Sequence, residues 1–141
     1  VERLLPYADI LIPSEEFAMG HTDEKSPADA AKRLYEMYNP DMVAVTCGKD
    51  GGVLYCGKEF IYYPAFKVDA VDSNGAGDVF HGAFAYAMTR GMNYENACIF
   101  SSAVSAKKCT KVGARDGVPQ LDEVLEFLKE RGYDEFEKNM E

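Results

Sequence analysis

Short apolar runs alternate with amphipathic stretches along most of the chain. Residues 8–13 and 41–46 are apolar runs bounded by proline or glycine, a pattern typical of buried strands in a parallel sheet. Between them, Ser26-Pro27 has the form of a helix N-cap followed by proline, and apolar side chains recur at helical spacing as far as Tyr38. This part of the chain is therefore predicted to be a strand, a helix and a second strand.

The remaining apolar segments predict a hairpin followed by three helices. The hairpin has strands at 53–55 and 58–64, with Gly57 near its turn. The predicted helices run from Ala76 to a stop at Arg90-Gly91, from Ala97 to about Cys109, and through 121–128. The acidic tail from Tyr133 to Glu141 is expected to be frayed surface. Strands that alternate with helices predict an α/β fold, a three-layer α/β/α sandwich with a mostly parallel sheet.

Residues 71–84 combine a glycine-rich turn with the start of an apolar helix. Gly75 and Gly77 tolerate backbone angles that a side chain forbids, so N–H groups can converge on an anion at the helix N-terminus. Phosphate is the expected anion. Asp78 would then place a carboxylate beside it, where the carboxylate can accept a proton from a hydroxyl that attacks the phosphate. The alternative is that Asp78 only caps the helix or interacts with its dipole.

Two other phosphate-binding motifs do not fit this turn. The dinucleotide fingerprint requires a glycine at the position of Phe80. The P-loop requires lysine followed by serine or threonine, where this chain has Ala83 and Phe84. A nicotinamide dehydrogenase is therefore disfavoured.

The run from Asp72 to Phe84, DSNGAGDVFHGAF, resembles the second signature of the ribokinase or PfkB-type carbohydrate kinases over its whole length. The resemblance implies a ribokinase-like fold and transfer of the γ-phosphoryl group of ATP to an alcohol group of a small carbohydrate. Asp78 would be the general base, and the backbone N–H groups of Gly75, Ala76, Gly77 and Asp78 would form the anion hole. ATP and Mg²⁺ are the implied cofactors.

The same resemblance implies further nucleotide-binding positions. Ser14 stands where the family has the Asn of an Asn-x-x-Glu motif that organises magnesium and phosphates, and Phe17 stands at the Glu position. Glu15 or Glu16 would have to replace that Glu. The alternative is that Ser14 is only a helix N-cap with acidic residues in the first turn.

Three more positions are implied on the nucleotide side. Thr46 and Gly48 lie in a Val-Thr-x-Gly-x-x-Gly pattern that approaches the ATP phosphates in the family, although the same loop also serves as a hairpin turn. Ser101 falls where related kinases place a residue against the adenine ring, and a small residue at a helix contact explains it equally well.

A monovalent cation, K⁺, is also implied beside the anion hole. In the family, loop carbonyl groups and the first acid of the signature often hold such an ion. By alignment Asp72, Asn74 and Gly113 would contribute to it here.

Composition limits the partners. The chain has 141 residues, a formal net charge of −9 and a pI near 4.7, which argues against nucleic acid or an anionic membrane as a partner. The four cysteines lack paired spacing and are read as reduced thiols, and two histidines make a histidine-rich zinc site implausible. The cytoplasm is the expected compartment.

Length determines how the resemblance is interpreted. Carbohydrate kinases of this family are about twice as long, so residues 1–141 are expected to be the C-terminal ATP-binding and catalytic portion, without the N-terminal substrate and lid half. A homodimer or association with that half would cover the exposed sheet. The acceptor stays open between a sugar, a sugar acid, a nucleoside and a pyridoxal-like alcohol. The alternative function is a nucleotide-binding remnant or sensor without catalysis.

Overall fold

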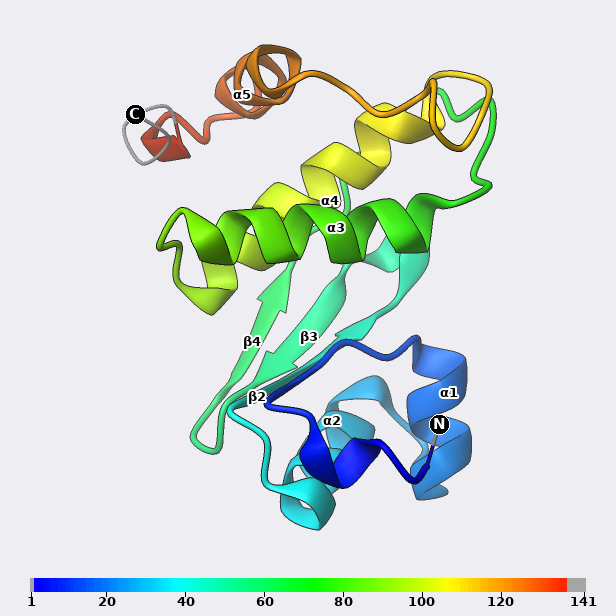
Figure 1. Ribbon diagram of the computed structural model, residues 1–141, viewed down its shortest axis with the longest axis vertical. Coiled ribbons are helices and arrows are strands. Elements are labelled where there is room, and N and C mark those ends of the chain that lie inside the picture. Colours follow the sequence, from blue (N-terminus) through cyan, green and yellow to red (C-terminus); the bar gives the residue numbers. More distant parts are fainter. Residues whose placement is uncertain (1, 137–141) are drawn as a thin grey trace. The chain divides into compact units, whose positions relative to one another are not determined.

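The computed structural model describes residues 2–136. The chain divides into two compact units, Val1–Pro64 and Ala65–Glu141, here called the sheet unit and the helical unit (Figure 1). The sheet unit contains, in chain order, η1 (Leu5–Tyr7), β1 (Ile10–Leu11), α1 (Glu15–Thr22), α2 (Pro27–Tyr38), β2 (Met42–Thr46), η2 (Gly48–Asp50), β3 (Gly52–Tyr55) and β4 (Phe60–Tyr63). The helical unit contains α3 (Ala76–Thr89), α4 (Tyr94–Cys109) and α5 (Leu121–Lys129).

The four strands form one mixed sheet in the order β1-β2-β3-β4. Strands β1 and β2 are parallel, whereas β2 with β3 and β3 with β4 are antiparallel. The prediction of a mostly parallel sheet is therefore wrong, and the predicted hairpin of β3 and β4 is confirmed. Strand β2 reaches β3 through the short turn η2, and β3 reaches β4 through residues 56–59, and connections this short join only antiparallel neighbours. The parallel pair is the one joined by two helices.

Helix α2 packs on β2 and β3 and forms the core of the sheet unit. Ser26 caps the helix as predicted, because its Oγ accepts a hydrogen bond from the Asp29 N–H at 3.1 Å. The helix then presents apolar side chains at helical spacing to strand side chains that alternate on one face of the sheet. This core includes Ala30, Ala31, Leu34, Val43, Val45, Val53 and Tyr55. The predicted three-layer arrangement needs a second helical layer and stays a prediction.

Helices α3 and α4 lie side by side and form the centre of the helical unit, and α5 packs against α4. Helix α3 ends at the predicted place, where Gly91 has φ 75°. Helix α4 begins at Tyr94, earlier than predicted, because Asn93 Oδ1 accepts a hydrogen bond from the Asn96 N–H at 2.8 Å. The capping asparagine therefore sets the start of the helix.

The segment after α5 folds back on the helical unit. The ring of Tyr133 lies 5.6 Å from that of Phe66 and 6.3 Å from that of Phe136, between centroids. Phe136 is only 1% exposed. The prediction of a frayed surface is thus wrong for Tyr133 to Phe136, because the aromatic side chains of this segment pack on the helical unit despite its acidic composition. Residues 137–141 lie outside the described residues.

Candidate functional site

The glycine-rich turn leads into α3 through Gly75, the N-cap residue. Gly75 has φ 76° and ψ 6°, in the left-handed region that favours glycine. A Cβ atom on Gly75 would lie 3.1 Å from the Cβ of Ala114, in the loop after α4. The turn therefore needs glycine at position 75, both for its backbone angle and for the close approach of that loop.

Three backbone N–H groups at the start of α3 are free to bind an anion. The Ala76 N–H donates to the Ser73 carbonyl oxygen at 3.1 Å, and the first bond of the helix runs from the Val79 N–H to the Gly75 carbonyl at 3.0 Å. Among residues 2–136, no acceptor is bonded to the N–H groups of Gly75, Gly77 and Asp78. These three groups, here called the cradle, carry the positive end of the helix dipole. The prediction grouped Ala76 with them, but its N–H is already bonded within the turn.

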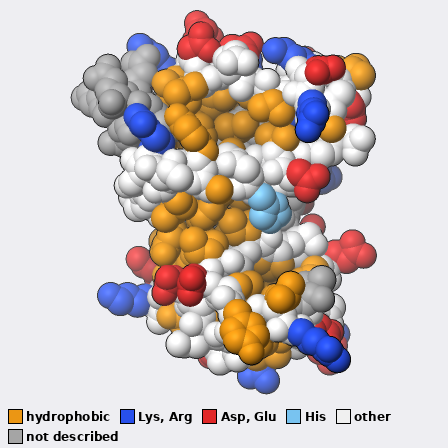
Figure 2. Space-filling view, viewed as in Figure 1, with side chains coloured by type: hydrophobic (Ala, Val, Ile, Leu, Met, Phe, Trp, Pro, Cys, Tyr) orange, Lys and Arg blue, Asp and Glu red, His pale blue; other side chains and the backbone are white. Residues whose placement is uncertain are grey.

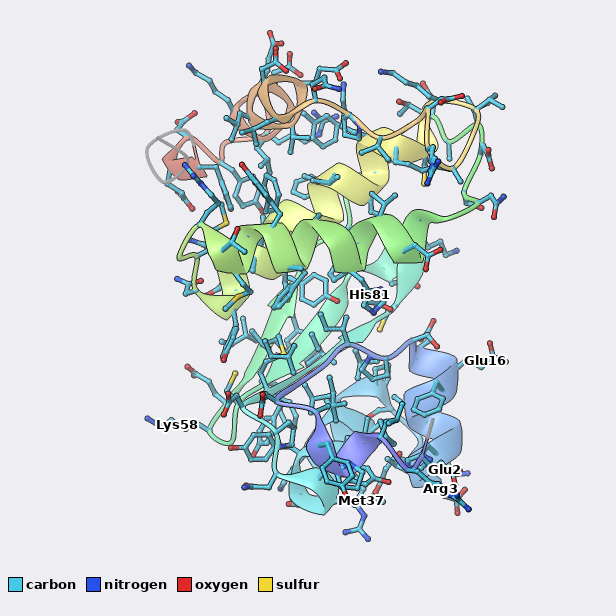
Figure 3. The ribbon with its side chains drawn as sticks, viewed as in Figure 1. Glu2, Arg3, Glu16, Met37, Lys58 and His81 are labelled. Carbon is cyan, nitrogen blue, oxygen red and sulfur yellow. The ribbon has the colours of Figure 1, made fainter. Side chains whose placement is uncertain are left out.

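Asp78 lies in the first turn of α3 and is exposed. No hydrogen bond or ion pair joins its carboxylate to any described residue. One turn later, the Nδ1–H of His81 donates to the Gly77 carbonyl oxygen at 2.7 Å; Figure 3 labels His81 on α3. The carboxylate of Asp78 is therefore available to accept a proton beside the cradle.

Asp72 ties the turn to the loop after α4. Its Oδ1 accepts a hydrogen bond from the Asn74 N–H at 2.9 Å, and its Oδ2 accepts one from the Gly113 N–H at 2.9 Å. These two bonds, and the charge of Lys108, hold the pKa of Asp72 below its ordinary value. The carboxylate is thus a structural acceptor that joins two loops of the helical unit.

The lowered pKa of Asp72 predicts a pH-dependent contribution to stability. A lowered pKa means that the ionised carboxylate stabilises the folded chain at pH values above the ordinary pKa of aspartate. This contribution is lost as the pH falls through the pKa that Asp72 has in the folded chain. We expect Asp72→Asn to be less stable than the wild type at neutral pH, with the difference shrinking below about pH 4. Thermal melts from neutral to acidic pH measure this. Asp69→Asn, at an exposed acid of the same unit, is the control, and a pH-independent difference for Asp72→Asn would contradict the prediction.

The sequence motifs did not point to Lys108, which lies in the last turn of α4. Its side chain is fully buried, and its Nζ donates to the Asp72 carbonyl oxygen at 2.8 Å and lies 3.9 Å from Asp72 Oδ2. The available signal was helical spacing, because Ala97, Ser101, Val104 and Lys108 fall on one buried face of α4. A lysine at the end of a buried stripe requires a partner.

The monovalent cation predicted at Asp72, Asn74 and Gly113 does not fit this arrangement. The Asp72 carbonyl and carboxylate oxygens already accept hydrogen bonds, from Lys108 and from two backbone N–H groups. The Gly113 carbonyl oxygen accepts the N–H of Gly117 at 3.2 Å. A cation bound to the Asp72 carbonyl would have to displace the Lys108 ammonium.

Ser101 is the predicted adenine contact, and it lies in the interior of α4. It is fully buried, and its Oγ donates to the Ala97 carbonyl oxygen at 2.6 Å. The hydroxyl is thus bonded within its own helix, as expected for a small residue at a helix contact.

Ser14 and Thr46 lie together at the carboxyl edge of the sheet. The two residues form a parallel bridge, and the Thr46 N–H donates to the Pro13 carbonyl oxygen at 2.9 Å. Gly48, with φ 55°, begins the η2 turn directly afterwards. Three residues predicted to approach phosphate thus share one edge of the sheet unit, where open α/β sheets bind ligands.

The N-cap interpretation of Ser14 is confirmed. Its Oγ accepts a hydrogen bond from the Phe17 N–H at 3.2 Å, and Glu15 and Glu16 occupy the first turn of α1. Both acids are exposed, and Glu16 projects outward from α1 (Figure 3). Phe17 is partly buried against the core of the sheet unit, so a carboxylate at that position would have been partly buried.

Cys47 lies next to Thr46, and its surroundings disfavour the thiolate form. Burial, followed by the charges of Glu15 and Asp50, raises the pKa of Cys47 to about 11. The thiol is therefore protonated at neutral pH. No disulfide joins the four cysteines, all of which lie within residues 2–136.

An apolar groove of about 360 Å³ lies in the helical unit. Figure 2 shows hydrophobic side chains gathered there between α3 and α5. Its lining comes from all three helices and from the loop before α5, and it includes Val79, Ala83, Tyr86, Phe100, Val104 and Leu121. The groove begins one residue beyond Asp78, so a ligand bound at the cradle has an apolar surface next to it.

Residues 2–136 contain neither a cluster of metal ligands nor a membrane-spanning helix. No group of three or more His, Cys, Asp or Glu side chains is placed to hold a metal ion. None of the helices in the same range is long and apolar enough to cross a membrane.

Known proteins resemble this chain over most of its length. The pfkB family of carbohydrate kinases matches residues 1–121. A ribokinase of Lactococcus lactis is 31% identical over 128 residues, which cover 91% of this chain and 41% of the relative. The ribokinase structure of Thermotoga maritima has a TM-score of 0.82 and 37% identity, covering 92% of this chain and 45% of that one. The structure of Arabidopsis thaliana ribokinase complexed with ribose and ATP has a TM-score of 0.81 and 28% identity. The match covers 92% of this chain and 43% of that one.

These matches confirm the predicted ribokinase-like α/β fold. They also show that the chain spans less than half the length of the relatives it matches.

Proposed function

The chain belongs to the pfkB family of carbohydrate kinases, and from this premise we propose that it is the ATP-binding and catalytic portion of a sugar kinase. The reaction is transfer of the γ-phosphoryl group of ATP to an alcohol group of a small carbohydrate, with ADP as the second product. A cytoplasmic location stays a prediction, in keeping with a reaction that consumes ATP.

One observation carries this proposal: at the start of α3, the N–H groups of Gly75, Gly77 and Asp78 and the Asp78 carboxylate have no hydrogen-bond partner among residues 2–136. Free N–H groups at a helix N-terminus suit a phosphate. An acid there repels the same phosphate, so a pure binding site gains nothing from it. A proton acceptor for an attacking hydroxyl accounts for both features.

In the proposed reaction, Asp78 accepts the proton of the acceptor hydroxyl as its oxygen forms a bond to the γ-phosphorus. The bond between that phosphorus and the β–γ bridging oxygen breaks, and ADP leaves with the electron pair. The cradle donates hydrogen bonds to the transferred group, where negative charge is redistributed. Each preorganised donor of this kind contributes about 3 kcal/mol to transition-state stabilisation.

Magnesium enters this proposal together with ATP. When bound with ATP, Mg²⁺ would be held largely by phosphate oxygens and water and would neutralise charge on the β- and γ-phosphates. Glu15 or Glu16 is proposed to contribute a carboxylate, and Ser14, Thr46 and Gly48 are proposed phosphate contacts on the resemblance alone. The apolar groove of the helical unit offers a surface for the nucleoside part.

A nucleotide-binding remnant or sensor without catalysis is the second candidate. The free N–H groups of the cradle suit a bound phosphate whether or not turnover follows, and this observation favours the second candidate. The two candidates share ATP binding and differ in turnover.

Calorimetric titration with ATP and Mg²⁺, followed by ADP release across a panel of acceptors, separates the two. The panel holds ribose, fructose, a sugar acid, a nucleoside and pyridoxal. Release stimulated by one acceptor supports the kinase and identifies its substrate class. ATP binding without stimulated release supports the binding remnant, and no ATP binding contradicts both.

A further inference from the structure

The C-terminal turn of α4 holds the glycine-rich turn at both ends. Ser105 Oγ donates to the Ala76 carbonyl oxygen at 3.0 Å, and Lys108 Nζ donates to the Asp72 carbonyl oxygen at 2.8 Å. Positions 105 and 108 are three residues apart and face the same side of the helix. The Cys109 carbonyl oxygen also accepts the N–H groups of Val71 and Asp72, at 2.7 and 3.1 Å. The segment before the cradle is therefore fixed by α4.

Lys108 is the only charged member of this set, and it has no exposed surface. Its Nζ lies 3.9 Å from Asp72 Oδ2, so the buried ammonium has an opposite charge nearby and a carbonyl oxygen at hydrogen-bond distance. A charge is tolerated in the interior only with such partners. Gly117 packs closely on Lys108, since a Cβ on Gly117 would lie 3.1 Å from the Lys108 carbonyl oxygen and 3.4 Å from its Cε. The ammonium is thus enclosed at one defined place.

We propose that Lys108 is a positioning residue that takes the place of a monovalent cation at Asp72, so that phosphate binding at the cradle needs no added K⁺. The ammonium and an alkali cation carry the same charge and seek the same oxygen atoms. Here the carbonyl oxygen of Asp72 is bonded to an ammonium that is covalently part of α4. Such a charge is present at any ionic composition, whereas a bound ion depends on its concentration.

The inference rests on the proposed function in that the cradle binds the phosphates of ATP. Lys108 does not contact the nucleotide in this scheme, because its side chain is fully buried. It acts through Asp72, whose backbone leads within a few residues to Gly75, Gly77 and Asp78. Removing the ammonium should therefore loosen the cradle without removing any of its N–H groups.

The test measures ATP affinity in the presence of Mg²⁺, with K⁺ replaced by the bulky cation choline at equal ionic strength. The ATP affinity of the wild type should differ by less than about twofold between K⁺ and choline, because the ammonium of Lys108 is present in both salts. Lys108→Ala should bind about tenfold more weakly in choline, since a hydrogen bond to a charged group is lost. Its affinity should recover in K⁺, because the truncated side chain leaves room for the ion. Lys108→Met fills that space with an apolar chain, so its binding should stay weak in both salts.

Lys107→Ala is the matched control. Lys107 lies in the same turn of α4, but its Nζ is 5.8 Å from the ring centroid of Phe127 and makes no bond to Asp72. This variant loses one positive charge and should behave as the wild type in both salts. If Lys107→Ala lost as much ATP affinity as Lys108→Ala, the change in net charge alone would explain the effect. That result would overturn the proposal.

Melting temperatures in the two salts separate failure of this inference from failure of the proposed function. K⁺ should raise the melting temperature of Lys108→Ala above its value in choline and leave the wild type and Lys108→Met unchanged. If the wild type binds no ATP, the proposed function fails, and the melting temperatures still decide the role of Lys108. A wild type whose affinity or melting temperature falls without K⁺ overturns the inference, whether or not the variants fold.

Discussion

Asp78→Asn lowers the rate of ADP formation by roughly two to four powers of ten, the usual contribution of a positioned general base. The amide has nearly the shape of the carboxylate, and it cannot accept the proton of the acceptor hydroxyl at neutral pH. The N–H groups of the cradle remain, and the repulsion between the carboxylate and the phosphates is removed. ATP affinity should therefore be equal to that of the wild type or tighter. Steady-state ADP release and calorimetric ATP binding measure the two effects.

Glu95→Gln is the control for a purely electrostatic role of Asp78. Glu95 is an exposed acid in the first turn of α4, where it meets a helix dipole of the same kind. Neutralising it should leave ATP binding and ADP release unchanged. Near-normal turnover in Asp78→Asn would exclude Asp78 as the base and leave it a partner of the helix dipole.

Gly77→Ala is expected to stabilise the chain and to damage the site at the same time. Gly77 lies inside α3 without a positive φ, and a Cβ atom added to it would meet no atom within 4 Å. Alanine at such a helical position stabilises by about 0.5–1 kcal/mol. Because Cα–Cβ bonds tilt toward the N-terminus of a helix, the new methyl group points toward the cradle. The backbone N–H of residue 77 is kept, but the methyl group would hold the phosphate away from it, so turnover should fall by roughly a hundredfold.

Gly20→Ala provides the comparison for the stability effect. Gly20 lies in α1, also has no atom within 4 Å of an added Cβ, and belongs to the sheet unit. It should give a similar rise in melting temperature with no change in turnover or ATP affinity. If Gly77→Ala keeps full activity, the position serves the helix only, and the phosphate does not bind where the cradle is proposed.

The glycine-rich turn was the most predictable part of the site. The backbone freedom of Gly75 and the position of Asp78 follow from local sequence, and the structure places Gly75 at φ 76° with Asp78 in the first helical turn. The N-caps at Ser14 and Ser26 were predictable for the same reason, since a cap involves residues three apart. Local rules work where the contacts are local.

The long-range contacts that hold the glycine-rich turn were not predictable in this way. Lys108 reaches Asp72 across 36 residues of sequence, and Gly113 reaches it across 41. No local pattern states which buried helix face will meet which loop. The strand directions were predicted only in part. The antiparallel pair of β3 and β4 was predicted as a hairpin, whereas β2 was predicted to belong to a mostly parallel sheet although the connection after it is just as short.

These long-range contacts determine when the site can exist during synthesis. Asp72 leaves the ribosome 36 residues before Lys108 and 41 residues before Gly113, the two residues that hold it in the folded chain. Closing a loop of that length carries an entropic cost that is met only once α3 and α4 have paired. A nascent chain therefore carries the complete signature while it still lacks the fixed turn, and nucleotide binding should begin only after α4 has folded.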